Sequence, residues 1–201
     1  MPDQSSLSEA SLARTQVIVL NGTSSAGKST LAPALQARLA EAGECWIVLG
    51  LDDFLGKLPW AWVAYGDHVG EHADEGIAFT MVEGEVECRV GRVGERMLAA
   101  YRGAVAAVAR AGINVIVDEV LLSEAGWTAW QHELAGLEVL WVAVTSDLEV
   151  LEQRERDRTD RMIGLARSQH GVVHRHAVYD VRVDTSNMDP ALAAAAILAA
   201  R

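Results

Sequence analysis

The stretch that most constrains the fold covers residues 17–30 and reads VIVLNGTSSAGKST. Its first four residues are apolar and mostly β-branched, which predicts a short buried strand. A run of small residues follows, and a helical pattern then begins at Lys28. Gly22, Gly27, Lys28 and Ser29 fit the spacing G-x-x-x-x-G-K-[ST]. A strand before this pattern and a helix after it are the context that a phosphate-binding loop (P-loop) requires.

We expect the backbone of this loop to be its binding surface, because small side chains let successive N–H groups point at phosphate oxygens. Lys28 is expected on a solvent-facing loop, where it reaches the terminal phosphates of ATP, and the Ser29 hydroxyl is expected to bind Mg²⁺. The alternative is a glycine-rich turn that matches the pattern by accident. The predicted nucleotide-binding residues are Gly22, Thr23, Ser24, Ser25, Ala26, Gly27, Lys28, Ser29 and Thr30.

Short apolar runs alternate with helical patterns along the rest of the chain. This alternation predicts an α/β fold, with a parallel sheet covered by helices on both faces and a ligand site at the carboxyl ends of the strands. Residues 1–15 are expected to form a disordered or fraying tail, and residues 16–201 a single domain. The predicted strands are 16–21, 45–50, 114–122, 138–146 and 179–186; the predicted helices are 28–43, 92–112, two within 147–170, and one that starts at Pro190.

Composition narrows the class of protein. The formal net charge of −11 disfavours a nucleic-acid partner, since binding a polyanion needs clustered positive charge. The longest apolar run, ALAAAAILAA, is too short to span a bilayer, and the first fifteen residues do not resemble a secretory signal. Cys45 and Cys88 lack metal-site spacing and fit a reduced compartment. These features therefore predict a cytoplasmic protein that neither binds nucleic acid nor spans a membrane. They leave the oligomeric state open.

Acidic residues follow two of the predicted strands. Asp118 ends the run VIVD and is expected to help bind Mg²⁺, while Glu119 should point to the opposite side of the strand. Asp52 and Asp53 follow the second strand, at the same edge of the sheet as the P-loop. A carboxylate there can accept the proton of an acceptor hydroxyl, and we expect Asp52 to be this base. The alternative for Asp118 is an acid that ends a strand at a turn. The alternative for Asp52 and Asp53 is a helix cap, and we expect Asp53 to be the cap.

Arginines gather in the segment RERDRTDRMIGLAR. Arg154, Arg158 and Arg161 recur at spacings of four and three, which would place them on one face of a helix. Residues 147–176 are therefore expected to form a lid whose Arg158 and Arg161 act on the transferring phosphate. The alternative is an exposed helix whose arginines pair with Glu155, Asp157 and Asp160.

The segment 57–90 gives no clear pattern of elements and is interrupted by several glycines. We expect it to contribute to an acceptor site, with core packing as the alternative for its aromatic residues. The residues predicted to contact the acceptor are Asp53, Phe54, Trp60 and Trp62.

Taken together, these stretches resemble the chloramphenicol phosphotransferases. The similar stretches include VIVLNGTSSAGKST, WIVLGLDDFL and AGINVIVDEVLL, in the family's order, and most specific is R-E-x-x-R-x-D-R-x-x-G at 154–164. The resemblance implies a P-loop kinase fold with a five-stranded parallel sheet of order 2-3-1-4-5. It also implies ATP and Mg²⁺, transfer of the γ-phosphate to the primary hydroxyl of chloramphenicol, Asp52 as catalytic base, and Arg158 and Arg161 as lid arginines. Residues 57–90 depart most from the family pattern.

The sequence thus predicts a small-molecule kinase that inactivates a drug such as chloramphenicol. A kinase for another antibiotic or metabolite hydroxyl is the second interpretation, and a nucleotide-binding NTPase without an organic acceptor is the third. Asp52 separates the third from the others, because an NTPase that transfers phosphate to water does not need a pocket for a hydroxyl acceptor.

Overall fold

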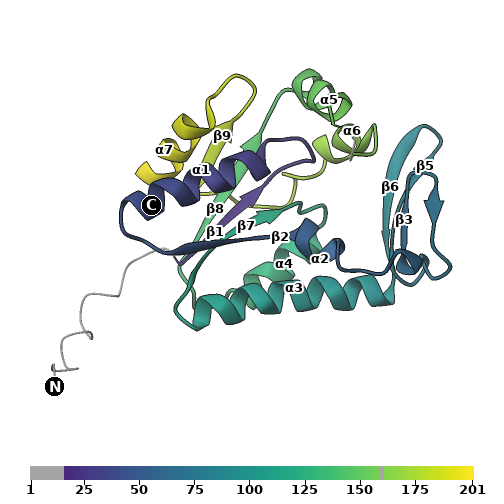
Figure 1. The fold of residues 1–201 in the computed structure, drawn as a ribbon, viewed down its shortest axis with the longest axis horizontal. Helices are drawn as coiled ribbons and strands as arrows, with labels where there is room; N and C mark the ends of the chain where they lie inside the picture. Colours follow the sequence, from purple (N-terminus) through teal and green to yellow (C-terminus); the bar gives the residue numbers. More distant parts are fainter. Residues whose placement is uncertain (1–15, 159–160) are drawn as a thin grey trace.

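A computed structural model describes residues 16–158 and 161–201 of the chain (Figure 1). The tail predicted for residues 1–15 lies outside the described residues. The core is a five-stranded, all-parallel sheet in the order β2-β7-β1-β8-β9. Counted along the five core strands, this is the predicted order 2-3-1-4-5, which is confirmed. The strands are β1 (Val17–Asn21), β2 (Trp46–Gly50), β7 (Asn114–Glu119), β8 (Val139–Thr145) and β9 (Val181–Asp184).

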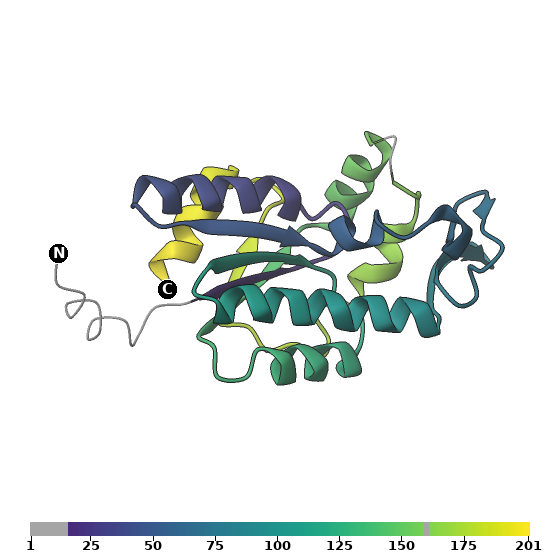
Figure 2. The ribbon, with the colours of Figure 1, turned by 60° about the horizontal axis from the view of Figure 1, so that its bottom comes forward.

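Helices cover both faces of this sheet, as predicted (Figure 2). Alternate residues of β1 explain how: Ile18 and Leu20 join one apolar cluster, and Val17 and Val19 join another. The first cluster includes residues of α1 (Lys28–Glu41) and α7 (Pro190–Ala199); the second includes residues of α3 (Arg92–Arg110) and α4 (Glu124–Glu133). Helix α4 was not among the predicted helices.

The arginine-rich segment forms two helices, as expected: α5 (Leu148–Arg156) and α6 (Leu165–His170). Helix α5 ends at Arg156, however, before Arg158 and Arg161. The prediction that one helix face carries Arg154, Arg158 and Arg161 is therefore wrong. Within residues 16–158 and 161–201, no helix combines the length and apolar character needed to cross a membrane.

The segment without a clear sequence pattern forms a second sheet, which projects beyond one end of α3 (Figure 1). Its strand order is β4-β3-β5-β6, and only the β3–β5 pair is parallel. Strands β5 and β6 form a hairpin whose two turn residues, Glu83 and Gly84, both have positive φ. The elements before and within this sheet are α2 (Leu51–Leu55), the 3₁₀ turn Trp60–Trp62, β3 (Val63–Tyr65), β4 (His68–Val69), β5 (Ile77–Val82) and β6 (Glu85–Val90).

Glycines let this small sheet pack closely against the start of α3. A Cβ atom on Gly94 would lie 2.5 Å from the Gly76 carbonyl oxygen and 2.8 Å from side-chain atoms of Ile77 and Val90. The Gly91 N–H donates to the same Gly76 oxygen at 2.8 Å. The docking of the small sheet on α3 therefore depends on the missing side chain at position 94.

We predict that Gly94→Ala lowers the free energy of unfolding by about 1–3 kcal/mol, because the added methyl group overpacks this contact. Urea denaturation measures the effect. Gly103→Ala, in the same helix, is the matched control: its Cβ would meet one Glu133 oxygen at 3.5 Å, an ordinary contact. The control should gain roughly 0.5–1 kcal/mol, since alanine favours a helix over glycine. Equal effects of the two substitutions would contradict the proposed close packing.

Candidate active site

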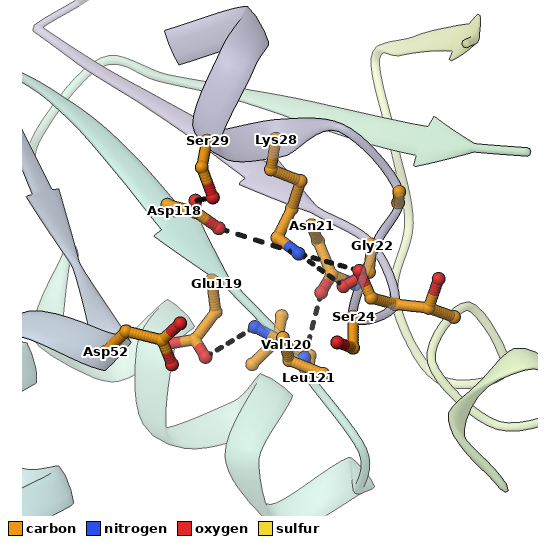
Figure 3. A network of polar contacts seen from close by, with 12 residues as sticks. Asn21, Gly22, Ser24, Lys28, Ser29, Asp52, Asp118, Glu119, Val120 and Leu121 are labelled. Atoms are coloured by element: carbon orange, nitrogen blue, oxygen red, sulfur yellow. Dashed lines mark hydrogen bonds and ion pairs between the residues drawn. The ribbon is translucent and has the colours of Figure 1, made fainter. Parts of the chain in front are cut away.

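The loop between β1 and α1 wraps around the side chain of its own lysine. Ser25 and Gly27 have left-handed backbone conformations, with φ of 61° and 85°. The Lys28 Nζ donates hydrogen bonds to the carbonyl oxygens of Gly22 at 3.0 Å and Thr23 at 2.8 Å (Figure 3). Lys28 is only 6% exposed, so the expectation of a solvent-facing lysine is wrong. The lysine fixes the loop's shape as well as carrying its charge.

Three hydroxyl groups of this loop are buried without a hydrogen-bond partner among the described residues: Thr23 Oγ1, Ser24 Oγ and Ser25 Oγ. Buried hydroxyls normally bind an acceptor, because leaving them unsatisfied costs free energy. A hydroxyl can donate to a phosphate oxygen. Together with the lysine ammonium, these donors fit the phosphates of a nucleotide.

The end of β7 places Asp118 against the start of α1. The Ser29 hydroxyl donates to one Asp118 oxygen at 3.1 Å, and the Lys28 Nζ lies 3.5 Å from the other (Figure 3). A carboxylate and a hydroxyl beside phosphates are the oxygen ligands that Mg²⁺ prefers. These two predicted metal-binding residues therefore lie together, and their chemistry fits the ion.

Glu119 points to the other side of β7, as its place in the strand predicted. One carboxylate oxygen accepts the Trp130 indole N–H at 2.8 Å, and the other accepts the Val120 N–H at 2.7 Å. Burial raises the pKa of Glu119 to about 7, partly offset by these two hydrogen bonds. Trp130 lies in α4, the helix that the sequence analysis missed, so this contact was not foreseen.

The two aspartates of α2 have different surroundings. The Asp53 carboxylate accepts the Gly50 N–H at 2.9 Å and so caps the helix, which was the structural alternative for this residue. The Asp52 carboxylate accepts a hydrogen bond from Arg161 Nη2 at 2.7 Å, forming an ion pair that the sequence did not predict. The Asp52 side chain is 62% exposed and that of Arg161 is 21% exposed. Asp52 therefore remains accessible while Arg161 holds it.

One cavity of about 1340 Å³ joins these groups. Its lining contains most of the predicted site residues: Ser24, Ser25, Ala26, Gly27, Lys28, Ser29, Thr30, Asp52, Asp53, Trp60, Asp118, Arg158 and Arg161. Gly22 and Thr23 are outside the lining and contribute carbonyl oxygens to Lys28 instead.

Two residues predicted to contact the acceptor do not line this cavity. The Phe54 ring packs against Tyr101, with ring centroids 4.9 Å apart, and joins the apolar cluster under α3. The Trp62 ring packs against His72, with centroids 4.7 Å apart. The expected acceptor contact is therefore wrong for both residues, because each ring packs against a neighbouring aromatic side chain outside the cavity lining.

Arg154 and Glu155 at the end of α5 hold the backbone of neighbouring loops. Arg154 donates to the carbonyl oxygen of Thr185 at 2.6 Å. The buried Glu155 carboxylate accepts the N–H groups of Gly164 at 2.7 Å and Ala166 at 2.8 Å. Glu155 was expected, in the alternative interpretation, to pair with the arginines of its own helix. Instead it fixes the chain at the start of α6.

Gln169 is a site residue that the sequence analysis missed. Its buried side-chain oxygen accepts the Ser24 N–H at 2.6 Å, which ties the P-loop to α6. Gln169 also lines the cavity. A glutamine in the polar stretch RSQH carries no signal that separates it from an exposed helix residue, so only the fold reveals this contact.

Comparison of the sequence with known proteins identifies a family and a relative. Residues 15–201 match the family described as "Chloramphenicol phosphotransferase-like protein". A Mycobacterium tuberculosis protein provisionally named an O-phosphotransferase is 32% identical over 179 residues, which cover 85% of this chain and 75% of that protein.

Solved structures share the fold at lower identity. The APS kinase of M. tuberculosis, in complex with AMPPNP and APS, aligns with a TM-score of 0.63 and 18% identity, over 94% of this chain and 98% of that one. A gluconokinase from Sinorhizobium meliloti aligns with a TM-score of 0.58 and 21% identity, over 93% of each chain. These likenesses establish the fold. Since the family match spans the whole described domain, the chain belongs to the chloramphenicol phosphotransferase-like family.

Proposed function

We propose that this enzyme transfers the γ-phosphate of ATP to a hydroxyl group of a largely apolar small molecule, with the primary hydroxyl of chloramphenicol as the first candidate. The observation that carries the proposal is the convergence of two chemistries on one cavity. Phosphate and metal ligands come from the P-loop and Asp118, and a carboxylate paired with arginine comes from Asp52 and Arg161.

On the nucleotide side, the P-loop hydroxyls and the Lys28 ammonium would bind the phosphates of ATP. Ser29 and Asp118 would hold Mg²⁺, which neutralises charge on the β- and γ-phosphate oxygens when bound. Lys28 lies between the loop carbonyls and Asp118, so its charge is already held at the phosphate site. Such preorganised charge stabilises the transition state without reorganisation during the reaction.

On the acceptor side, the small sheet presents an apolar panel to the cavity. Successive strand residues alternate between faces, and the cavity-lining face is formed in two rows. The panel consists of the row Val63, Ile77 and Val90 and the row Tyr65, Phe79 and Cys88. An apolar acceptor fits such a wall, because burying its surface is favourable. An NTPase that transfers phosphate to water has no use for this panel, so the panel favours an organic acceptor.

In the proposed reaction, the acceptor oxygen attacks the γ-phosphorus while its proton passes to the Asp52 carboxylate. The bond between the γ-phosphorus and the bridging oxygen breaks, and its electron pair leaves with ADP. Arg161 lies next to Asp52 in the cavity lining, where its guanidinium can reach charge that develops on the transferring group. Closure of residues 147–176 as a lid over this site stays a prediction. The cytoplasmic location and the identity of the acceptor also stay predictions.

A panel of hydroxylated compounds tests the proposal directly. Purified enzyme with ATP and Mg²⁺ is incubated with chloramphenicol, other hydroxylated antibiotics and metabolites, and the products are identified by mass. Chloramphenicol carrying one added phosphate is the expected product. Phosphorylation of a different compound would show that the enzyme is a kinase with another acceptor. ATP hydrolysis without any phosphorylated product would contradict the proposed function.

Lys28→Met should lower turnover by at least about 10²–10³-fold, because it removes the charge at the phosphates and keeps the side-chain stem. Since Lys28 is buried and holds two carbonyl groups, some loss of melting temperature should accompany this. Lys57→Met is the matched control: Lys57 is the chain's other lysine, and it is exposed and outside the cavity lining. Near-normal turnover of a folded Lys28→Met enzyme would refute the P-loop assignment.

Arg161→Ala should lower kcat more than it weakens ATP binding, because the arginine charge matters most as the phosphoryl group moves. Steady-state kinetics and a separate titration of ATP affinity distinguish the two effects. Arg167→Ala, which removes the ion pair between Arg167 on α6 and Glu152 on α5, should change neither. Unchanged kinetics in both measurements for Arg161→Ala would leave its contact with Asp52 as a surface ion pair only.

Asp52→Asn keeps the size of the side chain and removes its basicity. We expect it to bind ATP normally and to transfer phosphate at least about 10²-fold more slowly. Asp53→Asn should change the rate much less and cost up to about 1 kcal/mol of stability, because Asp53 caps α2. We would measure turnover, ATP affinity and melting temperature for both variants, to decide which aspartate is the base and which is the cap. An inactive Asp53→Asn enzyme beside an active Asp52→Asn enzyme would show that the base is assigned to the wrong aspartate.

A further inference from the structure

A contact between distant parts of the chain connects the small sheet to the catalytic arginine. Tyr65, the last residue of β3, accepts a hydrogen bond at its phenol oxygen from the Met162 N–H, at 2.7 Å. Met162 directly follows Arg161 in the sequence. The backbone that carries Arg161 is thus attached to a strand nearly a hundred positions earlier.

The same backbone is attached on its other side to α5. Glu155 accepts the N–H groups of Gly164 and Ala166, as described above. Arg161 in turn donates to Asp52 at 2.7 Å. The chain around Arg161 is therefore held by a carboxylate from α5 and a phenol from the small sheet, and its guanidinium lies beside the proposed base.

Tyr65 also belongs to the wall where an acceptor would lie. Its ring lines the cavity and contacts Phe79 edge to face, with ring centroids 5.9 Å apart. One side chain thus contacts the cavity through its ring and the arginine backbone through its hydroxyl. Anything packed against the Tyr65 ring also restricts the position of its hydroxyl, because the phenol is rigid.

We propose that Tyr65 is a positioning residue for phosphoryl transfer: its hydroxyl holds the Met162 backbone so that Arg161 stays beside Asp52, and its ring couples this arrangement to an occupied acceptor site. The kinetic part of this inference rests on the proposed function. The structural part rests on the observed hydrogen bond between Met162 and Tyr65. A merely structural tyrosine would affect stability without acting through Arg161.

Tyr65→Phe tests the structural part without reference to activity. It keeps the ring and its contact with Phe79 and removes only the hydroxyl. Hydrogen exchange measured by mass spectrometry should show peptides that contain Met162 exchanging several-fold faster, while peptides of β1 and β7 keep their rates. Unchanged exchange at Met162 in a folded Tyr65→Phe protein would overturn the proposal.

The kinetic part is tested with chloramphenicol, ATP and Mg²⁺. Tyr65→Phe should lower kcat roughly tenfold, less than the 10²-fold that a 1 Å misplacement can cost, and leave ATP affinity unchanged. Phe79→Leu is the matched change in the same panel without the link to Met162. It should raise the KM for the acceptor more than it lowers kcat. Equal kinetic patterns for the two variants would mean that Tyr65 acts only as part of the wall.

A double-mutant cycle then asks whether Tyr65 acts through Arg161. In the Arg161→Ala background, Tyr65→Phe should cost almost nothing in kcat, because the group that it positions is gone. A full tenfold loss in that background would overturn the proposal. If the wild-type enzyme does not phosphorylate chloramphenicol, the proposed acceptor fails; the cycle is then measured on ATP hydrolysis, and hydrogen exchange still decides whether Tyr65 holds the arginine backbone.

Discussion

The three polar contacts of the Lys28 ammonium group hold the functional end of the molecule in shape. Two of them close the P-loop on itself through the carbonyls of Gly22 and Thr23, and the third reaches Asp118 at the end of β7. A buried ammonium needs such partners, because an unpaired charge away from water costs several kcal/mol. The group that would bind a triphosphate is therefore also paired with Asp118, the carboxylate proposed to hold Mg²⁺.

The cavity is lined in part by residues from two sheets. The parallel sheet supplies the P-loop, Asp118 and Glu119 at the carboxyl ends of its strands, as expected for an α/β fold. The small sheet supplies an apolar wall and is docked on α3 through Gly94. The proposed reacting groups Asp52 and Arg161 meet between them. The proposed nucleotide site and the proposed acceptor wall therefore come from different segments of the chain.

The predictions succeeded where a local pattern has one physical explanation. All five predicted strands of the parallel sheet are present in the structure. Asp118 and Glu119 point to opposite sides of β7 because strand residues alternate. They failed where several structures fit one pattern. The spacing of Arg154, Arg158 and Arg161 suits a helix, but α5 stops at Arg156 and Glu155 binds the next helix instead. The hairpin of β5 and β6 was not predicted, because β6 contains three charged residues and short strands of this kind give a weak signal.

The sequence by itself determined the P-loop motif, the five strands of the parallel sheet and the resemblance to the family, because each of these rests on short motifs or runs of residues. Only the tertiary structure decided that Lys28 is buried and that Phe54 and Trp62 pack away from the cavity. It also brought Arg161 to Asp52 and Tyr65 to Met162, contacts between residues about a hundred positions apart. Such pairs depend on how whole elements pack, and a hydrogen bond between residues far apart in the chain leaves no periodic pattern in either segment.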